Sequence, residues 1–345
     1  MTRIRRFTVL AVALLVACQG GQVGPFGSAR PLPNEVGVGT RATFVVATPA
    51  GLIGLDAEGR VLGHIVRLPP GATPSSPTLD PDGEAIIFAL SQTTGEAGFG
   101  SDIYSVRLDG SELRPLVTHD RPSVFYATPA FDPTGNLLYF NRRAPVVGGV
   151  QYANFEFVET EDRIERVDLR SGERRTILMD ATEPTVSADG KTIVFVHMER
   201  GQQAGLWIAG TDGTGGRPFF KTRDRFWFLQ APRLSPTSRE VVFSSAGRTQ
   251  SRSAPSLPES GRAGGGGRLA HLEIPSELFL APIEGTSLRS IATTGDDIVP
   301  AWSPDGTRVA YVVVGTLAIV SAANGAVIMR AEGLGFFYGD LIWLR

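Results

Sequence analysis

Residues 300–311 read PAWSPDGTRVAY, and four earlier stretches of the chain repeat this pattern. Each copy opens with a proline and a short apolar stretch. A turn rich in Asp, Pro, Ser and Gly then leads into an apolar run with β-branched and aromatic residues. The earlier copies are PTLDPDGEAIIF at 77–88, PAFDPTGNLLYF at 129–140, PTVSADGKTIVF at 184–195 and PRLSPTSREVVF at 232–243. Their starts lie 52, 55, 48 and 68 residues apart, which indicates a repeat architecture.

The turn of each copy predicts a tight connection between two antiparallel strands. Gly83, Gly135, Gly190 and Gly306 supply the positive φ that such a turn favours. The fourth copy has Ser238 at this position, so we expect its turn to differ or to be strained.

A second pair of strands follows each copy, with its own turn. Residues 102–108 and 113–117 flank Asp109-Gly110-Ser111, and residues 317–320 and 326–329 flank Asn324-Gly325. Asp-Gly and Asn-Gly between apolar runs are strong hairpin signals. Four antiparallel strands per unit, at a period near 50 residues, predict an all-β fold, a β-propeller.

The two ends of the chain supply a sixth unit. Residues 42–68 contain three strand-like runs and lack the first strand. Residues 340–344 match the stretch 298–303 in spacing, so that Trp343 corresponds to Trp302. We therefore expect six blades of four strands, closed by N- and C-terminal strands that share one blade. The expected blades are approximately 75–118, 127–179, 182–222, 230–293 and 298–330, with 338–345 plus 42–68 as the last.

The repeated PxWSPDG-type unit, followed by a strand and an Asp-Gly turn, resembles the TolB-type propeller repeat of Gram-negative envelope proteins. The resemblance covers residues 42–345. TolB also carries an N-terminal domain, whose place is taken here by a short tether, so the resemblance concerns the propeller. It implies a protein-binding role in the cell envelope.

The N-terminus has the charged-then-apolar pattern of a secretory signal. Arg3, Arg5 and Arg6 precede an apolar run over 7–17 that is too short to span a bilayer. The run ends in Leu15-Val16-Ala17, and together with Cys18 these residues resemble the bacterial lipobox. This implies a signal peptide over 1–17, lipidation of Cys18 and a lipidated tether over 18–41 that anchors the protein to a membrane. A plain signal peptide with an incidental cysteine is the alternative. In the enterobacterial lipoproteins that this motif resembles, an Asp after the cysteine retains the protein at the inner membrane. Gln19 therefore implies the outer membrane, facing the periplasm.

The composition argues against several functions. The formal net charge of −2 carries no electrostatic signature of a nucleic-acid-binding protein. The four histidines show no zinc-ligand spacing, and no G-x-S-x-G motif occurs. We therefore expect no metal, no cofactor and no catalytic activity. The alternative is a periplasmic propeller hydrolase or lyase that acts on a sugar or lactone.

The candidate binding residues lie in the loops expected on one face of the propeller. These loops are 91–101, 142–163 and a low-complexity segment over 244–276, which we expect to be disordered. Arginine and aromatic residues, which dominate interface hot spots, gather in the 142–157 loop and in the links 119–126 and 223–228. An alternative for the aromatic residues is packing in the core. The candidate partner-binding residues are Arg142, Arg143, Tyr152, Phe155, His119, Arg121, Arg225 and Trp227. The expected protein is a monomeric scaffold for an envelope or peptidoglycan-associated partner.

Overall fold

The structure is a computed structural model of the full chain, and its fold is all-β. It describes residues 37–146, 160–199, 201–220, 225–226, 228–246, 248–249, 275–296, 298–336 and 339–344. In this part of the chain the helices are α1 (Val38–Arg41) and the 3₁₀ turn η1 (Gly95–Ala97). All other regular elements are strands.

Three of the sheets each consist of four antiparallel strands that follow one another along the chain, with the exception of the short β19 inserted in one of them. The first contains β12 (Ala181–Val186), β13 (Thr192–Glu199), β14 (Gln202–Gly210) and β15 (Arg217–Pro218). The second contains β17 (Gln230–Leu234), β18 (Glu240–Ser245), β20 (Ser276–Pro282) and β21 (Arg289–Thr294). The third contains β22 (Ala301–Trp302), β23 (Arg308–Val313), β24 (Thr316–Ser321) and β25 (Val327–Glu332).

A larger sheet of eight strands consists of two antiparallel units. The β4–β7 unit contains β4 (Thr73–Leu79), β5 (Ala85–Thr94), β6 (Gly98–Arg107) and β7 (Arg114–Val117). The β8–β11 unit contains β8 (Phe125–Phe131), β9 (Leu137–Pro145), β10 (Thr160–Asp168) and β11 (Arg174–Met179). A single parallel pairing, Ser101 with Phe125, joins the two units. The short strands β16 (Arg225–Phe226) and β19 (Arg248–Thr249) form a separate pair.

The two ends of the chain meet in one further sheet. It has the order β26-β1-β2-β3, with β1 (Phe44–Thr48), β2 (Gly51–Leu55), β3 (Val61–Val66) and β26 (Asp340–Trp343). Phe44 pairs with Trp343 and Ala47 with Asp340. The rings of Phe44 and Trp343 pack with centroids 4.8 Å apart, in a core that also contains Val312 and Leu317 of the neighbouring sheet.

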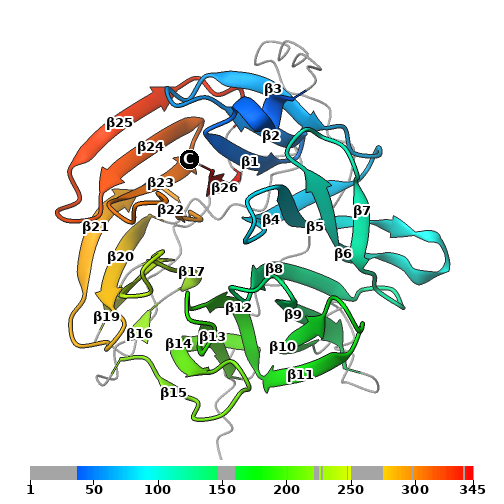
Figure 1. The fold of residues 1–345 in the computed structure, drawn as a ribbon. Helices are drawn as coiled ribbons and strands as arrows, with labels where there is room; N and C mark the ends of the chain where they lie inside the picture. The colour runs from blue at the N-terminus through cyan, green and yellow to red at the C-terminus, as the bar shows by residue number, and fades with distance from the viewer. Residues whose placement is uncertain are drawn as a thin grey trace, which may run out of the picture.

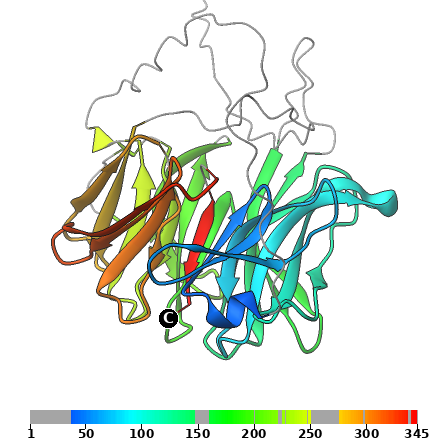
Figure 2. The same ribbon diagram turned by 90° about the horizontal axis from the view of Figure 1, so that it is seen from above.

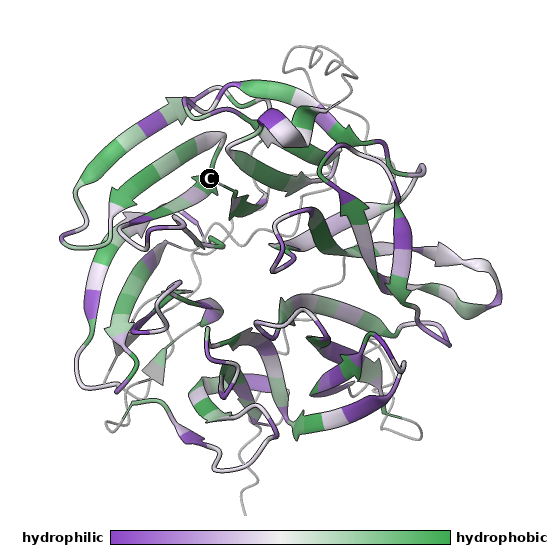
Figure 3. Ribbon diagram, in the orientation of Figure 1, coloured by the Kyte–Doolittle hydropathy of each residue, from purple (hydrophilic) through white to green (hydrophobic). Residues whose placement is uncertain are grey.

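The sheets are arranged around a common centre, with β4, β8, β12, β17, β22 and β26 innermost (Figure 1). Seen on edge, the inner strands such as β26 run roughly along the axis of this ring, whereas outer strands such as β25 are strongly inclined to it (Figure 2). Apolar clusters fill the seams between neighbouring sheets, for example Ile87 and Ile103 against Leu138 and Phe140. The hydropathy colouring shows mostly hydrophobic residues on β23–β25, whereas hydrophilic residues are frequent on β10 and β11 (Figure 3).

The repeated turn has the same geometry in all five copies. The backbone N–H of Gly306 donates to the carbonyl of Ser303 over 2.8 Å, and Gly306 has φ +69°. Ser238 takes the same left-handed conformation, at φ +55°, and donates to Ser235 over 2.7 Å. The fourth turn is therefore not different in shape. Ser238 places a side chain in the left-handed backbone region, which residues other than glycine disfavour. Of the two expectations for this turn, a different shape or a strained backbone, the second fits the structure.

Two of the expected loops are shorter than the sequence suggested. Residues 91–101 were expected to form a loop, but the β5–β6 ladder continues to the pair Thr94 with Gly98, so most of this segment is strand. Strand β9 likewise extends to Pro145, and β10 begins at Thr160. Most of the low-complexity segment 244–276, the predicted signal peptide, Cys18 and the predicted tether up to residue 36 lie outside the described residues.

Candidate functional site

The two ends of the strands define two faces of the ring. The repeated turns, such as 80–83 and 303–306, lie on what we call the turn face. The opposite ends of the strands, at Pro145, Thr160, Glu199 and Gln202, lie on what we call the loop face. Figure 2 shows this edge-on arrangement. Candidate sites occur at the centre of the ring and at one seam between sheets.

A cavity of about 240 Å³ lies at the centre, lined by prolines that open the repeat copies, among them Pro77, Pro129 and Pro184. Proline cannot donate to a strand ladder, so strands tolerate it at bulges. Each of these prolines sits in a register shift, between residues 75 and 78, 127 and 130, and 182 and 185. We call this cavity the channel.

The residue before the proline has an unusual backbone conformation in four copies. Ser76, Thr128, Glu183 and Ala231 have φ between +49° and +54°. This conformation costs a residue other than glycine about 1 kcal/mol or more, and it persists where surrounding contacts fix it. By the alignment of Trp343 with Trp302, Asp340 occupies the corresponding position at the C-terminus.

Two of these positions contribute carboxylates that bind the backbone of another sheet. The N–H of Ser76 donates to Oδ2 of Asp340 over 2.5 Å, and the N–H of Ala231 donates to Oε2 of Glu183. Arg233 interacts electrostatically with both Glu183 and Asp340. Burial raises the pKa of the Glu183 carboxyl, and the hydrogen bond from Ala231 and the charge of Arg233 only partly oppose it.

A polar network continues from the channel toward the loop face. Arg143 donates to Asp162, with Nε 2.9 Å from Oδ1, and the side chain of Arg143 is 34% exposed. Asn141 donates to Asp162 over 3.4 Å and accepts a hydrogen bond from Thr182 over 3.0 Å, which links two sheets. The charge of Arg143 also acts on Glu183. We call Arg143, Asp162, Glu183, Arg233 and Asp340 the mouth cluster.

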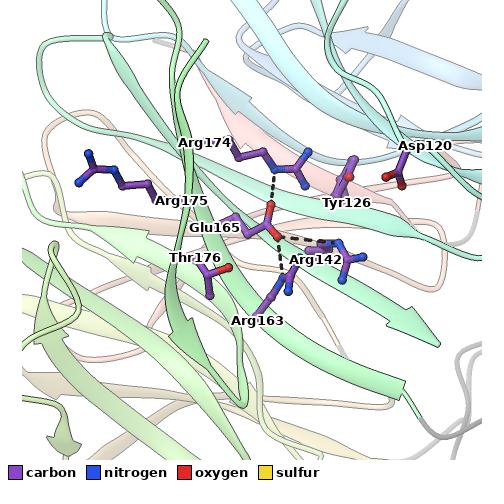
Figure 4. Close-up of a pocket in the computed structure, with 8 residues that line it drawn as sticks. All are labelled: Asp120, Tyr126, Arg142, Arg163, Glu165, Arg174, Arg175 and Thr176. Carbon is purple, nitrogen blue, oxygen red and sulfur yellow. Dashed lines mark hydrogen bonds and ion pairs between the residues drawn. The ribbon is translucent and has the colours of Figure 1, made fainter. Parts of the chain in front are cut away.

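The second candidate site is a cavity of about 290 Å³ at the seam beside the β8–β11 unit. Its lining residues are Asp120, Tyr126, Arg142, Arg163, Glu165, Arg174, Arg175 and Thr176 (Figure 4). Figure 4 shows Arg142, Arg163 and Arg174 converging on the Glu165 carboxylate. We call this cavity the seam pocket.

The structure brings some of the predicted binding residues together and separates others. Arg142 lies in the seam pocket with its side chain 8% exposed, and Arg143 lies in the mouth cluster. Arg121 is half-buried in the link between β7 and β8. Tyr152, Phe155 and Trp227 lie outside the described residues, and Arg225 is described only through the backbone pairing of β16.

His119 is buried and therefore does not face a partner in this conformation. Its backbone N–H donates to Oδ1 of Asp102 over 2.7 Å, and its Nδ1 lies 2.6 Å from the same oxygen. Its Nε2 lies 3.1 Å from the carbonyl oxygen of Gly98. These contacts fix the link between β7 and β8 to the β5–β6 hairpin.

Sequence reasoning missed the acids that organise both sites. Glu165 stands in the alternating charged stretch TEDRIERVD at 160–168, which could have indicated a charged face of a strand. Glu183 and Asp340 share the position before the repeat proline or its equivalent, and that alignment was the available signal. Within the described residues no cluster of His, Cys, Asp and Glu side chains is placed to hold a metal ion. That part of the chain also has no helix of the length and hydrophobicity needed to cross a membrane.

The fold is that of a β-propeller, and comparison with solved structures supports this class. No protein-family model matches the sequence, and no curated protein matches it significantly. TolB from Acinetobacter baumannii superposes with a TM-score of 0.62 at 18% identity, over 87% of this chain and 66% of that one. A putative TolB from Agrobacterium tumefaciens gives 0.54 at 19% identity, over 76% of this chain and 82% of that one.

An enzyme is also among the similar structures. An oligogalacturonate lyase from Vibrio parahaemolyticus gives a TM-score of 0.50 at 12% identity, over 81% of this chain and 70% of that one. This chain spans slightly less than two thirds of the Acinetobacter TolB chain. At these identities the likeness establishes the TolB-like propeller fold, and function has to be argued from the sites.

Proposed function

We propose that this protein is an envelope lipoprotein, anchored through Cys18 to the outer membrane and facing the periplasm, whose propeller binds a protein partner without catalysing a reaction. The mouth cluster carries the proposal. Its charged groups lie toward the centre of the ring, on the side of the loop face, and the side chain of its member Arg143 is about a third exposed. Charges at a rim steer a partner and fix its orientation, whereas buried pairs behind them set the shape of the site.

The proposal includes a closed ring of six blades. The eight-stranded sheet is two blades, since only one parallel pairing, Ser101 with Phe125, joins its units. The sheet of β26, β1, β2 and β3 is then the sixth blade, and its pairing of Phe44 with Trp343 supports closure. A closed ring gives a rigid scaffold, on which loop residues can bind with little loss of entropy. Tyr152, Phe155, Arg225 and Trp227 stay predicted contacts, and the protein is proposed to act as a monomer.

Site-specific photocrosslinking in intact envelopes tests partner binding. A crosslinker at Arg121, in the link between β7 and β8, is compared with one at Asp109, an exposed residue of the β6–β7 turn. We expect a discrete protein adduct at position 121 that is lost with Arg143→Ala and is absent at position 109. Equal adducts at both positions, or none from a folded and membrane-bound protein, would contradict the proposal. The intact mass of the same preparation tests cleavage before Cys18 and acylation of that cysteine.

One observation favours the catalytic alternative. Glu183 is an acid with a raised pKa directly before Pro184, which lines the central cavity, and perturbed carboxyl groups near clefts are frequent at active sites. If the protein is a sugar lyase or hydrolase, the purified chain should turn over a uronate oligosaccharide or a lactone, and Glu183→Gln should abolish the turnover. Activity that survives this substitution would assign it to another site or to a contaminant.

A further inference from the structure

The seam pocket is built on one face of the β8–β11 unit by the strand register. Tyr126 pairs with Arg142, and Arg142 pairs with Arg163, so these three side chains lie side by side on three strands. Glu165, two residues after Arg163, shares their face, as successive side chains in a strand alternate. Arg174 follows on β11, opposite Val167. The same face carries Leu138 and Phe140, which pack against the β4–β7 unit.

A buried carboxylate forms the centre of the seam pocket. The Glu165 side chain is 3% exposed, and it accepts hydrogen bonds from Nε of Arg163, over 2.6 Å, and from Nε of Arg174. Arg142 Nε lies 3.8 Å from the same carboxylate. Each guanidinium carries five N–H donors, so two carboxylate oxygens cannot satisfy three of these groups. Donors are thus left over around the pocket for another oxygen-bearing group.

The charge balance of the lining favours an anion. Arg142, Arg163 and Arg174 face the pocket together with Glu165 and Asp120, whereas Arg175, opposite Arg166 in the ladder, points away from them (Figure 4). Glu161 pairs with Arg142 over 2.8 Å and with Arg163 over 3.6 Å, but this acid is 33% exposed. Water and salt screen an exposed acid more strongly than a buried one. Glu161 therefore neutralises the arginines of the pocket less than a buried carboxylate would.

The arginines are held in place before any ligand arrives. The Arg174 guanidinium lies 4.5 Å from the centre of the Tyr126 ring and 5.1 Å from that of Phe140. The Arg142 side chain is 8% exposed and bonded to Glu161. Side chains that are already ordered lose little entropy on binding, and planar guanidinium groups suit oxyanions with two or more oxygens.

We propose that the seam pocket binds an oxyanion group, a phosphate or carboxylate of a small soluble ligand. A cavity of about 290 Å³ accommodates such a group with a short attachment. The polar lining of guanidinium, carboxylate and hydroxyl groups does not suit an apolar ligand. The inference does not rest on the mouth cluster, because the residues that line the seam pocket are all different from those of the mouth cluster.

Thermal melting and calorimetric titration of the full-length protein in detergent test this inference. The probes are inorganic phosphate and malonate, each compared with sodium chloride at equal ionic strength. We expect saturable binding and a rise in the melting temperature for at least one probe, since a ligand that binds the folded state stabilises it. Comparison of the two probes separates phosphate from carboxylate as the preferred group.

Four variants make the test specific. Arg163→Gln should weaken probe binding about tenfold, the loss expected for a charge-assisted hydrogen bond. Arg175→Gln, at a side chain that is 61% exposed and points away from the pocket, is a nearby control that should change binding little and leave folding intact. Glu165→Gln removes the competing carboxylate, so binding should strengthen in the fraction that folds. Arg60→Gln, at an exposed ion pair in another sheet, is the control and should change nothing.

The inference fails if neither probe binds more strongly than chloride to the wild-type protein. It fails equally if all four variants bind the probe as the wild type does, because the effect would then be general screening by salt. A cluster that serves only to hold the strands together predicts that Glu165→Gln lowers stability with no gain in probe affinity. If the Glu165 variant does not fold, the Arg163→Gln result decides the matter, because Arg163 lines the pocket.

Discussion

Substitution of Trp343, in the C-terminal strand β26, by alanine tests whether the ring of sheets is closed. Trp343 is 9% exposed, its ring packs 4.8 Å from that of Phe44, and the Arg308 guanidinium lies 4.8 Å from its centre. Removal of a buried Trp side chain costs about 3–5 kcal/mol, and the aromatic pair is included in that range. If β26 completes the last blade, Trp343→Ala should lower the free energy of unfolding by about 4 kcal/mol.

Trp302 provides a matched control, because it is the equivalent residue of the preceding unit and is also 9% exposed. Its Nε1–H donates to the carbonyl of Arg233 over 3.0 Å, so Trp302→Ala should cost about the same or slightly more. Both variants are measured by urea denaturation followed by far-ultraviolet circular dichroism, which does not depend on tryptophan fluorescence. A cost below about 1 kcal/mol for Trp343→Ala, beside a full cost for Trp302→Ala, would refute closure through β26.

Two further predictions concern the fourth turn and the channel. In the turn, Ser238→Gly should leave stability nearly unchanged. In this variant, relief of about 1 kcal/mol of backbone strain offsets loss of the 2.7 Å hydrogen bond that the Ala188 N–H donates to the Ser238 hydroxyl. Ser238→Ala loses the same hydrogen bond but keeps the strain. It should therefore be about 1 kcal/mol less stable than the glycine variant in the same denaturation assay. Beside the channel, Glu183→Gln should be more stable than the wild type at neutral pH, because the folded-state pKa of Glu183 lies above its unfolded value. As the pH falls below the folded pKa, protonation stabilises the native wild type. The difference in unfolding free energy between the two proteins should therefore narrow and vanish below the unfolded pKa, in denaturation curves recorded across acidic pH.

The repeat contained enough information to predict an all-β fold with antiparallel sheets. Each copy combines a turn with an apolar run, and this pairing specifies a hairpin locally, without reference to distant parts of the chain. The full length of the hairpin of β5 and β6 was harder to predict, because the stretch SQTTGEAGFGS at 91–101 is polar and glycine-rich, as loops are. Its strands nevertheless remain paired up to Thr94 and Gly98, where Gly98 has φ +74°. A ladder that is already formed extends through residues of low strand propensity.

The sites could not be predicted in the same way, because their residues come together only through register. Arg142 and Glu165 lie in different strands, and a shift of one residue between β9 and β10 would place them on opposite faces of the sheet. The sequence showed arginine-rich clusters near Arg142 and Arg143. It did not show that one would point into a seam and the other would bind Asp162 beside the channel. The burial of His119 was equally hard to predict, because its contact is Asp102 in β6, a residue 17 positions earlier in the chain.

The repeat proline explains why charged groups accumulate at the channel. Proline forces a bulge in the innermost strand, and the residue before it takes a positive φ in Ser76, Thr128, Glu183 and Ala231. The bulge frees a backbone N–H from the ladder, and such a donor must find another acceptor when it is buried. Glu183 and Asp340 supply that acceptor for Ala231 and Ser76. Both acids therefore hold neighbouring sheets together, and Arg233 offsets the charge that this brings into the channel. A partner that enters the channel would have to bind Arg233 without breaking these bonds, which favours a polar group that accepts hydrogen bonds over a cationic one.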